Sequence, residues 1–117
     1  MHELSVAMNI VKIAEEEAKK ANIQYFSAIE LEIGTLAGIE LDVFHSVWKA
    51  AVKSSVLENA ERLIRSVPAI AICRDCSHEF RIDFLYDVCP ECGSFQKHIS
   101  RGQELRIKTL SLPDPAS

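Results

Sequence analysis

Several features that would assign a protein to a common class are missing from this sequence. A membrane-spanning helix needs about 20 consecutive apolar residues. No apolar stretch in this chain of 117 residues approaches that length. No basic segment followed by an apolar run stands at the start, so we expect no secretory signal. Lysine and arginine form no run, and the formal net charge is −4, which disfavours a nucleic-acid partner. We therefore expect a cytoplasmic protein that binds neither membranes nor nucleic acid.

Glycine is also scarce, and the few glycines form no phosphate-binding loop. Four are present, at positions 34, 38, 93 and 102, and none belongs to a GxxxxGK[ST] motif. Any step that uses a nucleoside triphosphate is therefore expected to belong to another protein. The sequence also shows no nucleophile combined with a neighbouring base, so we expect a protein that is not an enzyme.

The spacing of apolar residues predicts two helices. From Leu4 to Ala21, apolar residues recur at intervals of three and four, and Asn22 is a plausible end of this helix. Residues 40–57 return to the same spacing, with Phe44 and Trp48 on one face. Each helix therefore has one face suited to packing on a sheet.

Three further segments have the character of strands. In AIELEIG the apolar residues alternate with Glu30 and Glu32, which we expect on the solvent side of a half-buried strand. The segment RLIRSVPAIAIC predicts a second strand that is interrupted or ends near Pro68, and QELRIKTLSL predicts a third. Because strands 62–67 and 103–110 flank the cysteine segment, we expect them to be neighbours in one sheet.

The order of these elements predicts an α+β fold. Two helices pack on a small three-stranded sheet, and a four-cysteine zinc-ribbon module is inserted before the last strand. The predicted domains are a discontinuous one, 1–70 plus 101–112, and a cysteine-containing one, 71–100. Residues 113–117 are expected to be a flexible tail. The edge strands of so small a sheet could pair between chains, so the sequence leaves a homodimer open.

The cysteines are the clearest chemical signal. They form two CxxC pairs separated by twelve residues: Cys73 and Cys76 in CRDC, and Cys89 and Cys92 in CPECG. A two-residue gap lets both sulfurs of a pair point at one centre, and two such turns supply the four thiolates of a structural zinc site. Gly93 follows the second pair, where a backbone position with positive φ is useful.

Other interpretations of the cysteines stay open at this level. An iron centre can use the same tetrahedral set of four sulfurs. Disulfides are disfavoured because the cytoplasm keeps thiols reduced. His78 is close enough in sequence to replace one cysteine as a ligand, although a surface histidine is the simpler interpretation.

The first three residues, Met-His-Glu, form a second candidate metal site. The Met1 amine and the His2 ring have ordinary pKa values of about 7.7–8.0 and about 6.5, so both can lose protons near neutral pH. With the backbone nitrogen of His2 they can form fused chelate rings, an arrangement suited to Ni(II) or Cu(II), and Glu3 could supply a further donor. The simpler interpretation is that Glu3 places negative charge at the positive end of a helix.

The combination of MHELS at the start, LEIGTLAGIE in the first half and CRDC…CPECG in the second resembles the HypA/HybF family. This resemblance covers the chain to about Leu110. It implies a nickel metallochaperone for maturation of [NiFe] hydrogenase, and in some bacteria of urease. It also implies nickel binding by His2 with the Met1 amine and Glu3, and structural zinc binding by Cys73, Cys76, Cys89 and Cys92.

The resemblance further implies two partners, the maturation GTPase HypB and the hydrogenase large-subunit precursor, which would receive the nickel. Glu40, in the loop after Gly38, and His98, beyond the second cysteine pair, are candidates for a remaining nickel position. If His98 did bind nickel, the state of the zinc module would influence the nickel geometry.

A zinc-ribbon interaction module without a nickel role is the alternative function. Segment 73–92 carries five acidic residues against two arginines, and four thiolates around Zn²⁺ would make it more negative still. Because phosphate backbones repel such a surface, a protein partner fits this alternative better than a nucleic acid.

Overall fold

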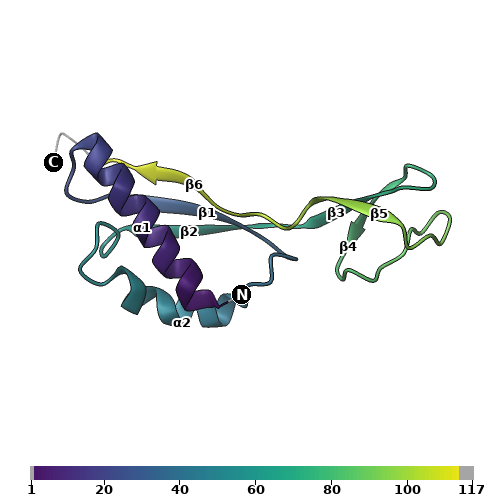
Figure 1. The fold of residues 1–117 in the computed structure, drawn as a ribbon, viewed down its shortest axis with the longest axis horizontal. Coiled ribbons are helices and arrows are strands. Elements are labelled where there is room, and N and C mark those ends of the chain that lie inside the picture. Colours follow the sequence, from purple (N-terminus) through teal and green to yellow (C-terminus); the bar gives the residue numbers. More distant parts are fainter. Residues whose placement is uncertain (1, 114–117) are drawn as a thin grey trace. The chain divides into compact units, whose positions relative to one another are not determined.

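The computed structural model describes residues 2–113 of the chain. Its elements are α1 (Glu3–Ala21), β1 (Ala28–Gly34), α2 (Leu41–Val52), β2 (Glu61–Val67), β3 (Ala69–Cys73), β4 (Glu79–Ile82), β5 (Lys97–Arg101) and β6 (Leu105–Ser111) (Figure 1). The strands form two three-stranded sheets, ordered β2-β1-β6 and β4-β3-β5. The α+β class predicted from the sequence is confirmed. Met1, and residues 114–117 of the predicted tail, lie outside the described residues.

The described residues divide into two compact units. The first comprises 2–31, 39–64 and 107–113, and the second comprises 32–38 and 65–106. The first unit therefore contains both helices, and the second contains all of β3, β4 and β5. Neither helix has the length and apolarity that spanning a lipid bilayer would require.

Helix α1 follows the predicted pattern closely. Its buried face is made of apolar residues at helical spacing: Val6, Ala7, Ile10, Val11, Ala14 and Ala18. The helix ends at Asn22, which adopts a left-handed conformation with φ of 56°. The N–H of Asn22 donates to the Lys19 carbonyl, and that of Ile23 to the Ala18 carbonyl, so the last turn is hydrogen-bonded. Asn22 was predicted as the stop, and its tolerance of this conformation explains why.

Helix α2 is shorter than the predicted 40–57 because it ends at Val52. Lys53 has extended backbone angles, and Ser54 has a positive φ of 62°, so the helix cannot continue. The Ser55 hydroxyl donates to the Val52 carbonyl at 2.6 Å, and the Glu58 carboxylate accepts the Ser54 N–H at 3.0 Å. These side chains bond to backbone N–H and carbonyl groups that would otherwise need hydrogen bonds from a longer helix.

The core of the first unit lies where the two helices meet strand β1. Helices α1 and α2 pack against each other, and the ring of Phe44 is fully buried beside Trp48, with 5.5 Å between ring centroids. Ile29 and Leu31 of β1 are also almost completely buried. Burial of these large apolar side chains is the main force that holds the helices on the sheet.

One expectation about β1 is wrong. The sequence pattern placed Glu32 in solvent, whereas in the structure Glu32 is only 9 % exposed. Its carboxylate accepts a hydrogen bond from the Arg106 guanidinium at 2.6 Å. Strand β1 is the central strand of its sheet, so side chains of both neighbouring strands flank those of β1. A buried carboxylate needs a partner such as Arg106. Glu30 is half-buried.

The predicted neighbours β2 and β6 belong to the same sheet but are not adjacent. Strand β1 lies between them, so the expectation of direct pairing is wrong. The most apolar of the three strands takes the central position, where burial is greatest. Pro68 separates β2 from β3, and these two strands belong to different sheets. The interruption predicted at this proline is therefore confirmed.

The second sheet is centred on β3, with β4 and β5 antiparallel on either side. Its core consists of small and apolar residues: Ala69, Ala71, Cys73, Phe80, Ile82 and Cys89, with Leu36 and Ile99 packed against it. Gly102 has a φ of 110°, and a Cβ there would lie 2.5 Å from the Cβ of Ala69. Only glycine fits both this conformation and this close approach.

Candidate metal centres

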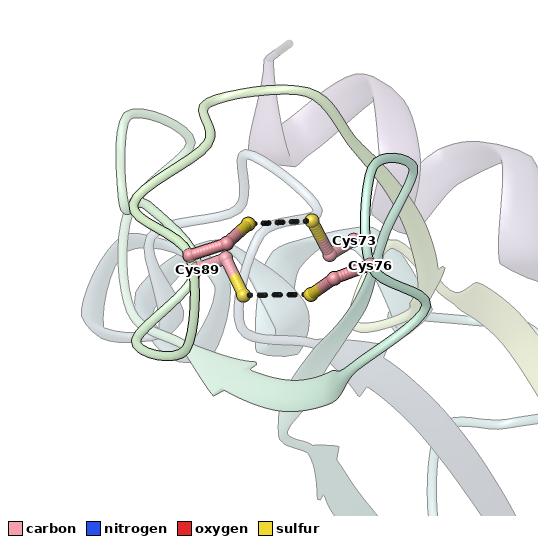
Figure 2. Close-up of side chains that lie close together, drawn as sticks. Cys73, Cys76 and Cys89 are labelled. Atoms are coloured by element: carbon pink, nitrogen blue, oxygen red, sulfur yellow. Dashed lines mark hydrogen bonds between the residues drawn. The ribbon is translucent and has the colours of Figure 1, made fainter.

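The four cysteines converge on one point in the second unit. All four sulfurs lie within 4.8 Å of one another. Two contacts link the pairs, Cys73 to Cys92 and Cys76 to Cys89, each with 3.6 Å between the sulfurs. Figure 2 shows the labelled side chains of Cys73, Cys76 and Cys89 pointing toward a common centre. Within residues 2–113 this is the one group of three or more histidine, cysteine or acidic side chains arranged to hold a metal ion.

The first pair is presented by a hydrogen-bonded turn at the end of β3. The Cys73 carbonyl accepts the N–H of Ser77 at 2.9 Å, and the Cys73 N–H donates to the His78 carbonyl at 2.9 Å. Ser77 has a positive φ of 65°. The chain therefore reverses immediately after Cys76, which brings the sulfur of Cys76 back beside that of Cys73.

The second pair repeats this turn. The Cys89 carbonyl accepts the N–H of Gly93 at 2.8 Å, and the Cys89 N–H donates to the Ser94 carbonyl at 2.9 Å. Gly93 has a φ of 75°, so the positive φ predicted there is confirmed. Both turns use the same offsets of four and five residues from the first cysteine. Equivalent local geometry is the reason that two short segments supply four ligands to one centre.

A polar link that the sequence analysis missed joins the two turns. The Ser94 hydroxyl donates to the carboxylate of Asp75, which lies inside CRDC. The N–H of Arg74 also donates to the Gln96 carbonyl at 3.0 Å, and the Arg74 side chain to the Lys97 carbonyl at 3.2 Å. The sequence carries only a weak signal for the bond between Ser94 and Asp75, because acidic residues and serines are common near cysteines. These bonds hold one turn against the other independently of the sulfurs.

The sulfurs affect one another's protonation. Burial raises the pKa of Cys73, but N–H groups of Cys76 and Asp75 and the neighbouring thiols outweigh it and lower that pKa to about 7. The N–H of His78 lowers the pKa of Cys76, yet burial and the three other sulfurs raise it overall to about 12. The N–H of Ser94 lowers the pKa of Cys92, yet the Cys73 sulfur and burial raise that pKa overall. The lowered pKa of Cys73 and the raised pKa of Cys76 show that the clustered sulfurs do not favour the thiolate form equally.

The donor set fits a tetrahedral metal ion. Zinc–thiolate bonds of about 2.3 Å place the sulfurs of a tetrahedron about 3.8 Å apart, close to the 3.6 Å contacts between the pairs. Cys73 and Cys89 are almost fully buried, whereas Cys76 and Cys92 are exposed. His78 does not belong to the ligand group, and its ring stacks on Phe80 with centroids 6.1 Å apart. A metal bound by four thiolates would have no open position for substrate.

The N-terminal candidate site is arranged quite differently. His2 precedes α1 in an extended conformation, and its exposed side chain makes no capping hydrogen bond. Glu3 is the first residue of the helix, and its carboxylate accepts the N–H of Glu40 at 3.0 Å. This bond is the main cause of the lowered pKa of Glu3. The Met1 amine, predicted as a further donor, lies outside the described residues.

The remaining candidates occupy separate elements. Glu40 stands before α2 with an exposed side chain, and its backbone links it to Glu3. His98 lies on β5 opposite Ile72, with an exposed ring. Neither joins a group of three or more metal-binding side chains within residues 2–113. The hydrogen bond between the Glu40 N–H and the Glu3 carboxylate brings Glu40 to the N-terminal residues His2 and Glu3.

A histidine on α2 also has a partner that the sequence analysis did not anticipate. The Arg62 guanidinium donates to Nδ1 of His45 and lies over the Trp48 ring, 5.3 Å from its centroid. Burial lowers the pKa of Arg62. His45 is thus engaged in packing α2 against β2.

Comparison with known proteins identifies the family. A family model described as hydrogenase/urease nickel incorporation, metallochaperone, HypA matches residues 1–112. The hydrogenase maturation factor HypA of Francisella philomiragia subsp. philomiragia is 39 % identical over 110 residues, covering 94 % of this chain and 97 % of that protein. The same factor from Azotobacter vinelandii is 38 % identical over 112 residues, covering 96 % and 99 %.

Solved structures agree with the sequence comparisons. The solution structure of the Ni metallochaperone HypA from Helicobacter pylori is similar with a TM-score of 0.70 and 30 % identity, covering 96 % of this chain and 97 % of that one. A second solution structure of a HypA protein gives a TM-score of 0.71 at 30 % identity, covering 97 % of both chains. The chain belongs to the HypA family of hydrogenase/urease nickel-incorporation metallochaperones.

Proposed function

We propose that this chain binds Ni(II) at its N-terminus and delivers it during maturation of [NiFe] hydrogenase, while a zinc ion in the four-cysteine centre has a structural role. The observation that carries this proposal is the family match over residues 1–112, which includes both candidate centres. Service to urease is the closely related possibility that the family description also names.

The nickel donors that we propose are the His2 ring, the Met1 amine and Glu3. The His2 side chain supports this assignment because it is exposed and not used to cap α1. The amine and the imidazole must both be unprotonated to bind, so acidification should release nickel. Glu40 is a further candidate because its N–H holds the Glu3 carboxylate. His98 is the candidate from which we expect the smallest contribution, because it joins no group of metal-binding side chains within residues 2–113.

The zinc ion that we propose would be bound by Cys73, Cys76, Cys89 and Cys92. The regular geometry of the two turns supports zinc, because it needs no rearrangement to complete a tetrahedron. A closed site of this kind contributes the binding free energy of the metal to the folding of its domain. Iron would use the same ligands, so metal analysis of the purified protein separates the two.

The proposed organisation assigns one metal to each domain. Residues 1–70 plus 101–112 would form the nickel-binding domain, and residues 71–100 the zinc-binding domain. We further propose that the chain acts in the cytoplasm with the GTPase HypB and the hydrogenase large-subunit precursor. A nucleotide-dependent partner is supported by the absence of a GxxxxGK[ST] motif from the sequence. A homodimer is compatible with the small sheets.

A nickel titration of tag-free, zinc-loaded protein tests this function, with the mass of the intact N-terminus confirmed first. The proposal predicts tight binding that is lost in His2→Ala. The comparison variant is His45→Ala, which removes another exposed histidine of the same unit together with its bond to Arg62, so circular dichroism of both variants first establishes that the fold is kept. Equal nickel binding by wild type and His2→Ala would contradict the N-terminal site and leave a zinc-ribbon adaptor without a nickel role as the better account.

A further inference from the structure

The segment between β4 and Cys89 exposes an unusual amount of apolar surface. In residues 83–88, here called the aromatic loop, Phe84 is 54 % exposed, Leu85 57 %, Tyr86 66 % and Val88 49 %. Four large apolar side chains within five positions are therefore in contact with water. Scattered exposed apolar residues are ordinary, but a contiguous group of them marks a surface that another molecule covers.

The aromatic loop is held in one conformation by its own hydrogen bonds. The Asp87 carboxylate accepts the N–H groups of Asp83, at 2.8 Å, and of Phe84, at 3.1 Å. The Asp87 N–H in turn donates to the Phe84 carbonyl at 3.1 Å. The rings of Phe84 and Tyr86 stack with centroids 5.1 Å apart and planes 4° from parallel. Because these side chains are already ordered, the loop loses little conformational entropy when a partner binds it.

Both ends of the aromatic loop are attached to buried residues of the second unit. Ile82, the last residue of β4, is 2 % exposed, and Cys89, which follows the loop directly, is 1 % exposed. The sulfur of Cys89 belongs to the four-cysteine centre. A metal bound by the four sulfurs would therefore hold one end of the loop and help to present its aromatic side chains rigidly.

The charge around the aromatic loop restricts the kind of partner. Residues 81–97 contain three acidic residues, Asp83, Asp87 and Glu91, and two basic residues, Arg81 and Lys97, at the ends of the segment, so its formal charge is −1. A metal bound by four thiolates would add further negative charge next to the loop. Like charges would oppose docking of this loop on its counterpart in a second chain or on an anionic lipid surface. A protein surface with positive charge at its edge is favoured by the same argument.

We propose that the aromatic loop inserts Phe84 and Tyr86 into an apolar pocket, bordered by lysine or arginine side chains, on a protein with which this chain exchanges nickel. The proposal rests on the proposed function for the identity of that protein. Aromatic side chains in a desolvated pocket are the usual source of binding energy in such interfaces, and the acidic residues around them would set the orientation.

Binding measurements on the zinc-loaded full chain test this proposal. The probes are purified HypB and purified hydrogenase large-subunit precursor, both taken from the organism that supplies this chain. The variant is Phe84→Ser combined with Tyr86→Ser. We expect it to bind at least one of the two proteins about tenfold or more weakly than wild type. Tyr25→Ser is the matched control, because Tyr25 is 51 % exposed but lies in the other unit, and we expect it to bind like wild type.

A charge variant tests the second part of the proposal. The side chain of Asp83 takes no part in the hydrogen bonds of the aromatic loop, whereas that of Asp87 does. We therefore expect Asp83→Lys to keep the loop conformation, to slow association and to make binding less sensitive to salt. Zinc content and nickel affinity should be unchanged in every variant, which separates loss of docking from loss of fold.

Each other result has a definite meaning. Unchanged binding of both proteins by the double variant overturns the proposal, and so does failure of wild type to bind either protein. A change in oligomeric state by sedimentation, or loss of binding to phosphatidylserine vesicles, would assign the loop to self-association or to a membrane and also overturn it. Failure of the proposed function is distinguishable, because it shows in the nickel titration of wild type.

Discussion

The two candidate metal centres of this chain differ in almost every physical respect. The cysteine centre is made by two equivalent hydrogen-bonded turns, has four identical donors and buries Cys73 and Cys89. The N-terminal centre has the exposed side chain of His2, beside a glutamate held by one backbone N–H. A preformed, closed site retains its metal, whereas an exposed site at a chain end lets donors leave one at a time. The comparison indicates how one small chain can keep one metal and release another.

The largest effect is expected from Cys73→Ser. Cys73 is a buried residue of the proposed ligand set, and a hydroxyl is a poor substitute for a thiolate. Zinc affinity should therefore fall by more than about 100-fold, which exceeds the usual cost of losing an outer partner of a metal ligand. Competition with a chromophoric zinc chelator measures this. Ser94→Ala, which removes only the bond to Asp75, should have a clearly smaller effect. Equal zinc affinity in Cys73→Ser and wild type would contradict a four-thiolate site.

The next largest effect is expected at the N-terminal centre, on the affinity for nickel. His2→Ala should lower nickel affinity by about 100-fold or more while zinc content stays at one ion per chain. Isothermal titration with nickel, followed by metal analysis of the same samples, gives both numbers. A variant that lost both metals together would show that the two centres do not act separately and would remove the basis of the comparison.

A smaller effect is expected where the two cysteine turns differ in sequence. Gly93 and Ser77 occupy equivalent positions with positive φ, and no atom lies within 4 Å of a Cβ added at Gly93. Gly93→Ala should therefore destabilise the zinc-loaded protein through backbone strain alone, by about 1–2 kcal/mol. Ser77→Gly should relieve the same strain and be neutral or stabilising. Chemical denaturation of both variants tests this. A Gly93→Ala variant that is as stable as wild type, or a Ser77→Gly variant that is clearly less stable, would contradict the equivalence of the turns.

The smallest effect is expected from His98→Ala. His98 lies exposed on β5 and joins no group of metal-binding side chains within residues 2–113. Nickel affinity should stay within about threefold of wild type, far from the tenfold that corresponds to 1.4 kcal/mol. A loss comparable to that in His2→Ala would instead establish His98 as a nickel ligand and couple the zinc-binding segment to nickel.

The sequence predicted the cysteine centre well because its geometry is local. Each pair of ligands is separated by two residues, and each turn depends on residues within five positions of its first cysteine. The bond between Asp75 and Ser94 was missed because it joins segments 19 residues apart, and no short pattern encodes it. At the N-terminus, the sequence could name donor types but could not show that Glu40 supplies an N–H to Glu3.

The fold was predictable where periodicity decides it and not where pairing does. The two helices and the strands on either side of Pro68 follow from the spacing of apolar residues. The order β2-β1-β6 does not, because it depends on which strands meet across long separations. Glu32 was misplaced for the same reason, since its partner Arg106 lies 74 residues away. Strand β5 was missed because KHISR has little apolar alternation, and its pairing with β3 defines it.

The central claim, that one chain holds a retained metal and a releasable one, is tested most directly by chelator challenge. Protein loaded with both zinc and nickel is mixed with excess EDTA, and the metals that remain bound are followed over time by native mass spectrometry. The account predicts that nickel leaves first and that a species with zinc alone persists. Loss of both metals at the same rate, or zinc leaving before nickel, would contradict it.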